Sequence, residues 1–101
     1  MKLPEDPFIL ELLPEFLEEW LKDMDTKFPE ILKARNADDL YRLGHTLKGS
    51  CFQFGLDETA QLGIELMGYA RSGDWEKAAA LYTPLVNGFK EMKAFLEAEA
   101  R

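Results

Sequence analysis

Hydrophobic residues recur three or four positions apart along most of the chain, which is the spacing of one face of an α-helix. A short apolar segment after Pro7 predicts a short N-terminal helix, and Pro14 predicts a restart as a second helix. The apolar stripe of that second helix continues across Pro29, so we expect a kink there rather than an end. The stripe consists of Leu17, Trp20, Leu21, Met24, Phe28, Ile31 and Leu32.

The next helix has signals at both of its ends. Asn36 is a candidate N-cap, and Asp38 and Asp39 follow in the first turn, where the helix dipole favours negative charge. Gly55 can adopt the left-handed conformation that ends a helix, so we expect this helix to run to Phe54.

Two further helices complete the pattern. Asp57 is expected to cap the third helix and Gly73 to end it, while Asp74 caps the fourth helix, in which Pro84 predicts a bend. Four helices joined by short turns predict an all-α fold, an antiparallel up-down-up-down four-helix bundle. We expect the short N-terminal helix to pack across one end, and residues 1–101 to form a single domain.

Composition narrows the possible partners. The formal net charge is −7, which argues against nucleic acid and against anionic membrane surfaces, because both are bound through clustered Lys and Arg. No apolar run approaches the roughly 20 residues of a membrane span, and acids and prolines interrupt the N-terminal apolar residues. The single cysteine, Cys51, excludes an internal disulfide and favours the cytoplasm. The acidic surface favours a monomer.

The only histidine, His45, lies in the second bundle helix. On a helical wheel the apolar residues of this helix gather on the side opposite the imidazole. They are Leu40, Leu43, Leu47, Cys51 and Phe54. Tyr41, Lys48, Gly49 and Phe52 fall on the same side as His45, so the imidazole is expected to point away from the core. Periodicity alone leaves open an ordinary surface histidine and an ordinary solvated lysine.

Two glycines inside this helix each cost roughly 1 kcal/mol relative to alanine. Gly49 lies one turn from His45 on the same face, so a partner could approach the imidazole closely there. Gly44 borders the core stripe, where close helix packing is the better explanation. Tyr41 and Phe52 are aromatic residues on the outer face and indicate a docking patch. The alternative for both residues is partial burial against the N-terminal helix. For Tyr41 this alternative and the docking patch are equally favoured.

The segment HTLKGS at His45–Ser50 resembles the signature of histidine-containing phosphotransfer domains. In that family a further glycine follows ten residues after the histidine, which Gly55 matches, and Gln53 matches the polar position two residues before it. The upstream ARNADDLYRLGH, the leucines Leu62 and Leu66, and the turn ARSGDWEKA extend the resemblance over nearly the whole chain.

The resemblance implies a phosphocarrier. His45 would accept a phosphoryl group from the aspartate of a receiver domain and pass it to another receiver. Lys48 would neutralise the phosphate, and Gly49 would provide clearance. Tyr41, Phe52 and Gln53 would contact the partner, with the bulky Phe52 narrowing the range of receivers. The partners would be receiver domains of response regulators or of hybrid sensor kinases.

The chain lacks a P-loop and a kinase-type Gly-rich loop, so we expect a carrier without autokinase activity rather than an enzyme. Phosphoryl transfer needs mainly positioning and charge compensation, so no cofactor of its own is expected, and Mg²⁺ should belong to the receiver. Whether the chain stands alone or belongs to a larger sensor kinase is open, although the initial Met and the length favour a free-standing carrier.

Two other functions fit parts of the sequence. A metal or hydrolytic site is disfavoured because His45 and Cys51 are six residues apart and project to opposite faces. A non-phosphorylated helical adaptor that binds a partner through Tyr41 and Phe52 shares the fold and the docking patch, and is the main alternative.

Overall fold

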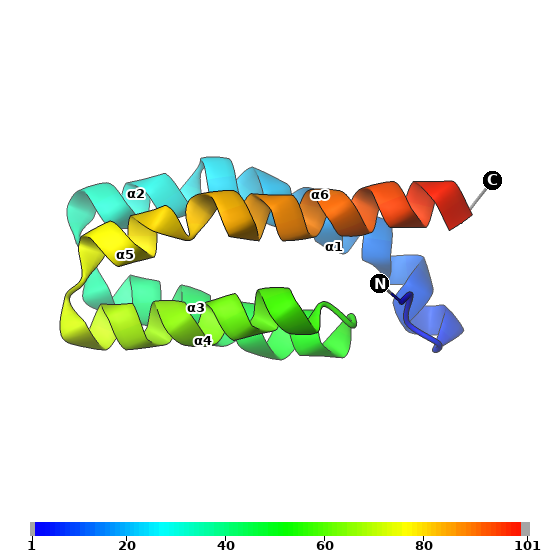
Figure 1. The fold of residues 1–101 in the computed structure, drawn as a ribbon, viewed down its shortest axis with the longest axis horizontal. Helices are drawn as coiled ribbons and strands as arrows, with labels where there is room; N and C mark the ends of the chain where they lie inside the picture. Colours follow the sequence, from blue (N-terminus) through cyan, green and yellow to red (C-terminus); the bar gives the residue numbers. More distant parts are fainter. Residues whose placement is uncertain (1, 100–101) are drawn as a thin grey trace.

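Six helices follow one another along residues 2–99, the part of the chain that the computed structural model describes (Figure 1). They are α1 (Pro7–Asp25), α2 (Lys27–Ala34), α3 (Ala37–Gln53), α4 (Asp57–Ser72), α5 (Trp75–Ala80) and α6 (Tyr82–Glu99). In Figure 1, α2 continues the course of α1, and α6 continues that of α5. The six helices therefore form four antiparallel rods, which confirms the all-α four-helix bundle expected from the sequence.

The rods are arranged as two pairs. Figure 1 shows α3 beside α4 in one layer, and α1 and α2 beside α5 and α6 in the other. Between the layers lies a core of fully buried side chains, because each helix turns its apolar stripe inward. The largest of these side chains are Phe28, Phe89, Leu13, Leu17, Met24, Leu40, Leu47, Leu66, Leu85, Met92 and Cys51.

The predicted restart at Pro14 is wrong, because α1 is continuous from Pro7 to Asp25. Pro14 is exposed, while Leu13 and Leu17 on either side of it are fully buried. Packing of these leucines in the core stabilises the helix despite the backbone hydrogen bond that proline cannot form. The first turns of α1 nevertheless cross one end of the bundle as expected. There the Phe16 ring stacks on Phe54, with 3.9 Å between the ring centroids.

Pro29 and Pro84 interrupt their helices instead of only bending them. The interruptions lie at Thr26 and Leu81, each three residues before the proline. Proline has no N–H for the carbonyl four residues earlier, so the regular hydrogen bonding fails just after that carbonyl. Tyr82, next to one interruption, donates a hydrogen bond of 2.5 Å to Asp25, next to the other.

The turns around α3 and α4 follow the sequence closely. The Asn36 side chain accepts a hydrogen bond from the Asp39 N–H at 3.1 Å and caps α3. Gly55 and Gly73 have φ of 83° and 70°, the left-handed conformation expected at both helix ends. Asp57, expected as a cap, is instead the first helical residue, because the buried Leu56 occupies the N-cap position without a side-chain cap.

Candidate functional site

His45 lies near the middle of α3, and its side chain is exposed as the helical wheel predicted. The opposite face of α3 packs into the core, where Leu40, Leu47 and Cys51 are fully buried. Burial raises the pKa of the Cys51 thiol to about 12, so this sulfur stays protonated and cannot act as a nucleophile near neutral pH.

The residues predicted around His45 share its exposed side of α3. Lys48 is half-buried, while Gly49, Phe52 and Gln53 are exposed, with Phe52 at 41%. A Cβ atom built on Gly49 would come within 4 Å of no described atom outside its own stretch of helix. The backbone one turn from His45 is therefore open to an approaching partner.

Tyr41 is half-buried, but α4 supplies a contact that the sequence analysis did not foresee. The phenol oxygen of Tyr41 accepts a hydrogen bond of 2.8 Å from Nη2 of Arg71. The guanidinium carbon lies 4.9 Å from the centroid of the Tyr41 ring, within the range of a cation–π interaction. Tyr41 precedes His45 by one helical turn, so these contacts bring a cation from α4 to the turn of α3 before the histidine.

A close crossing of α3 and α4 sets this arrangement. A Cβ atom on Gly44 would lie 2.6 Å from the Gly63 carbonyl oxygen, and one on Gly63 would lie 2.7 Å from the Gly44 carbonyl oxygen. Contacts this short exclude any side chain at either position, so the close-packing explanation for Gly44 is confirmed.

The outer face of α4 adjoins the histidine face of α3. Ile64 and Arg71 are seven residues apart, about two helical turns, and therefore share one side of α4. Gly68 lies between them on that side, exposed, and a Cβ atom there would also meet no described atom within 4 Å. Ile64 is 40% exposed. The candidate site thus spans two helices, with a bare glycine on each.

Sequence reasoning missed Arg71, Ile64 and Gly68 because periodicity within α4 does not show which residues of α3 it meets. The signal that could have found them is the pair Gly44 and Gly63. Two buried glycines on neighbouring antiparallel helices mark a crossing point and show that α4 lies against this part of α3, so that a long side chain such as Arg71 can reach Tyr41.

Within residues 2–99, no group of three or more His, Cys, Asp or Glu side chains lies close enough to hold a metal ion. Over the same residues, no helix has the length and hydropathy that crossing a lipid bilayer requires.

The family model for the Hpt domain matches residues 9–100. The chain belongs to the Hpt family. Domains of this family carry phosphoryl groups on histidine in phosphorelays and work with receiver domains. Searches of curated proteins and of solved structures return no match. In this Hpt domain the matched segment includes all six helices except the first two residues of α1.

Proposed function

We propose that this Hpt domain carries a phosphoryl group on His45, accepting it from a receiver-domain aspartate and passing it to the aspartate of another receiver. The observation that supports this most is the exposure of the only histidine in the middle of a well-packed helix, with open backbone one turn away. Family membership supports the same role.

In the accepting step, a lone pair on an imidazole nitrogen attacks the phosphorus of the aspartyl phosphate. A nitrogen–phosphorus bond forms as the bond from the aspartate oxygen to phosphorus breaks, and the carboxylate leaves with the electron pair. The reverse sequence, with a second receiver aspartate as the attacking group, passes the phosphoryl group on. The chemistry consumes no cofactor of this chain, and the Mg²⁺ that neutralises the aspartyl phosphate would be held by the receiver.

Charge compensation on this side of the transfer comes from two cations. Lys48 is one turn after His45 on α3, and Arg71 reaches the same face from α4 through its contacts with Tyr41. Both can stabilise negative charge on a phosphorylated histidine through charge-assisted hydrogen bonds. We expect Lys48 to assist the transfer, whereas His45 is indispensable.

The surface around His45 suits a docking partner that must approach closely. Phe52 and Ile64 offer exposed apolar area from two different helices, and Tyr41 and Gln53 add polar groups. Gly49 and Gly68 leave the backbone uncovered between them. We therefore assign this surface to receiver domains of response regulators or hybrid sensor kinases, met in the cytoplasm by a monomeric carrier.

The domain has no nucleotide-binding motif in its sequence, so we propose that it does not phosphorylate itself from ATP and depends on the receiver for most of the catalysis. A non-phosphorylated adaptor remains the second candidate, because Phe52 and Ile64 would serve docking equally well without any transfer.

The two functions are separated by incubating the domain with phosphorylated receivers and treating the product with acid and with alkali. A carrier gives a phosphorylated domain whose label is lost in acid and kept in alkali, because a phosphohistidine has that stability. His45→Gln should remain unlabelled while still binding the receiver. Binding without any transfer of label from a panel of cognate receivers would favour the adaptor and overturn the carrier.

A further inference from the structure

Arg71 has a neutral partner in a chain that is rich in carboxylates. The sequence holds 19 Asp and Glu residues against 12 Lys and Arg residues. Arg71 nevertheless forms no ion pair with a carboxylate among residues 2–99. Its Nη2 atom donates the 2.8 Å hydrogen bond to the phenol oxygen of Tyr41, and its guanidinium carbon lies 4.9 Å from the centroid of the same ring. Within the described part of the domain, the charge of this guanidinium is therefore not neutralised.

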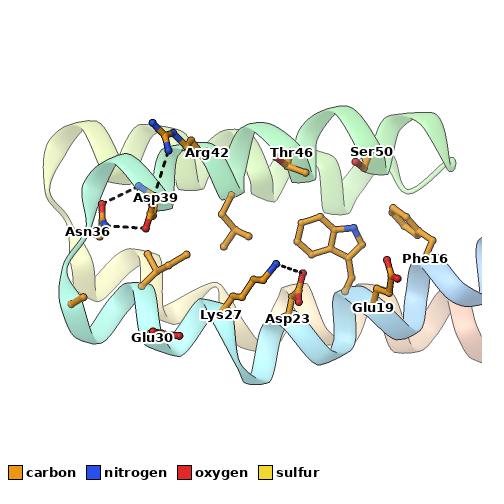
Figure 2. A pocket seen from close by; sticks show the side chains of 14 residues that line it. Phe16, Glu19, Asp23, Lys27, Glu30, Asn36, Asp39, Arg42, Thr46 and Ser50 are labelled. Carbon is orange, nitrogen blue, oxygen red and sulfur yellow. Dashed lines mark hydrogen bonds and ion pairs between the residues drawn. The ribbon is translucent and has the colours of Figure 1, made fainter.

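Arg42, the arginine that follows Tyr41 on α3, is engaged in a different way. Its Nη1 atom lies 4.0 Å from Oδ1 of Asp39, and Asp39 also accepts a hydrogen bond of 2.9 Å from the Asn36 amide at the start of α3 (Figure 2). A new anion would have to compete with a carboxylate for Arg42. For Arg71 it would compete only with a phenol.

The antiparallel packing of α3 and α4 directs Arg71 toward His45. Long side chains of a helix lean toward its N-terminus, and in antiparallel helices these directions are opposed. Arg71 therefore leans back along α4, toward the contact with α3 at Gly63. His45 follows the α3 side of that contact, Gly44, by one residue and leans toward Tyr41. Tyr41 and His45 are four residues apart, so their backbone positions are separated by about 6 Å along α3.

A phosphoryl group on His45 is a stronger partner for a guanidinium than a phenol is. It carries about two negative charges near neutral pH, of which Lys48, one turn further along α3, can offset one. Arginine binds phosphate oxygens through charge-assisted hydrogen bonds, which are roughly twice as strong as hydrogen bonds between neutral groups. Phosphorylation of His45 therefore favours transfer of the Arg71 guanidinium from the phenol to the phosphoryl oxygens.

We propose that Tyr41 is a positioning residue that competes with phosphorylated His45 for the guanidinium of Arg71. Tyr41 holds the guanidinium at the turn before His45 while the imidazole is free. When His45 is phosphorylated, Arg71 contacts the phosphoryl group for most of the time and Tyr41 for the remainder. The hydroxyl of Tyr41 thus shortens the lifetime of the phosphohistidine and keeps the phosphoryl group easier to pass on. This inference rests on the proposed phosphorylation of His45.

Chemical phosphorylation tests the inference without any receiver. Phosphoramidate transfers its phosphoryl group to an imidazole nitrogen as its own phosphorus–nitrogen bond breaks and ammonia leaves. With isotope-labelled tyrosine, we expect the ring resonances of Tyr41 to shift when His45 is phosphorylated, because the guanidinium leaves the ring. In the Arg71→Gln variant the same resonances should shift much less, since no cation is there to leave.

The Tyr41→Phe variant keeps the ring and removes only the hydroxyl. We expect the lifetime of its phosphohistidine, followed by ³¹P NMR, to be about threefold longer than in the wild type, because the hydrogen bond that competes for Arg71 is lost. Tyr82→Phe makes the same chemical change on α6, in the other layer of the bundle, and should leave the lifetime unchanged.

The double variant Tyr41→Phe, Arg71→Gln separates competition for Arg71 from a merely structural role of Tyr41. It should have the same short lifetime as Arg71→Gln alone, because the hydroxyl acts only through the guanidinium. An equal lengthening by Tyr41→Phe with and without Arg71 would overturn the proposal.

A Tyr41→Phe lifetime equal to or shorter than that of the wild type would also overturn the proposal, as would equal shifts of the Tyr41 ring in wild type and Arg71→Gln. The proposed function fails separately. A domain that shows all the expected effects with phosphoramidate, but accepts nothing from phosphorylated receivers, would support this inference and contradict the carrier role.

Discussion

At the scale of single residues, the glycines of α3 and α4 fall into two kinds, one at the contact between the helices and one facing open space. Gly44 is excluded from carrying a side chain by a carbonyl oxygen 2.6 Å from its would-be Cβ. Gly49 and Gly68 have no such neighbour among the described residues. Each of these two costs its helix about 1 kcal/mol for no packing gain, which points to a requirement outside the folded domain itself.

Replacing Gly49 or Gly68 with Ala should raise the free energy of unfolding by about 1 kcal/mol, because helix propensity improves and no atom obstructs the new methyl group. Urea denaturation measures this. Gly49→Gln should stabilise the helix modestly but slow transfer from a phosphorylated receiver sharply. If the Gly49→Gln variant accepts phosphate at the wild-type rate, the clearance role is disproved.

Arg71→Gln should shorten the lifetime of the phosphorylated domain, because one of two cations near His45 is lost. The phosphohistidine is best made with phosphoramidate, so that no receiver is needed, and its decay followed by ³¹P NMR. Lys48→Ala should also shorten the lifetime and slow transfer, though less than His45→Gln, which removes the acceptor. Lys90→Gln is the matched control, since that side chain is exposed on α6, in the layer of the bundle that does not contain α3 and α4. Equal lifetimes for Arg71→Gln and Lys90→Gln would remove Arg71 from the site.

At the scale of helices, the features that sequence could predict are those decided by neighbours along the chain. Asn36 caps α3, Gly55 and Gly73 end α3 and α4, and His45 faces away from the core, all as the local pattern indicates. The effect of each proline could not be predicted from its neighbours in the sequence alone. Pro14 leaves α1 intact because Leu13 and Leu17 hold it in the core, whereas the effect of Pro29 appears three residues earlier, at Thr26.

Contacts between helices were beyond prediction for a related reason. The pairing of Arg71 with Tyr41 depends on the register in which α3 and α4 cross. A single sequence predicts which side of each helix faces the core, but it does not predict how neighbouring helices are positioned along one another. The histidine and its neighbours on α3 could therefore be found, while the half of the site on α4 could not.

The crossing of α3 and α4 can be tested by Gly44→Ala. The new methyl group would press on the Gly63 carbonyl, so we expect a loss of about 1–3 kcal/mol in the free energy of unfolding, the usual cost of overpacking. Gly49→Ala, on the same helix, is the control that stabilises. An unchanged or higher stability for Gly44→Ala would mean that the two helices are not held this closely in solution.

The two interrupted rods are tied together by Tyr82 and Asp25. The hydrogen bond to Asp25 raises the pKa of Tyr82 above its ordinary value of 10.0, so the protonated phenol is favoured in the folded state. Its contribution to stability is therefore complete below pH 10.0 and is lost as pH rises through the folded-state pKa. Tyr82→Phe should lower the melting temperature at neutral pH, and this difference should shrink in strong alkali. A difference that is absent at neutral pH, or that grows in alkali, would contradict the link.

At the scale of the whole molecule, the bundle separates its surfaces by helix pair. The α3–α4 layer presents His45 with Phe52, Ile64 and two exposed glycines, whereas α1, α2, α5 and α6 form the opposite layer. The domain measures 43 × 20 × 18 Å, with the helices along its longest dimension. Under the proposed function, this elongated bundle holds His45 in a fixed position while the receiver supplies most of the catalysis.

The most direct measurement is single-turnover transfer of label from a phosphorylated receiver to this Hpt domain, with the modified residue located by mass spectrometry. The account predicts label on His45 alone, release of that label to a second receiver, and none on His45→Gln. Label on any other residue, or a His45→Gln variant that still accepts and passes it on, would contradict the account.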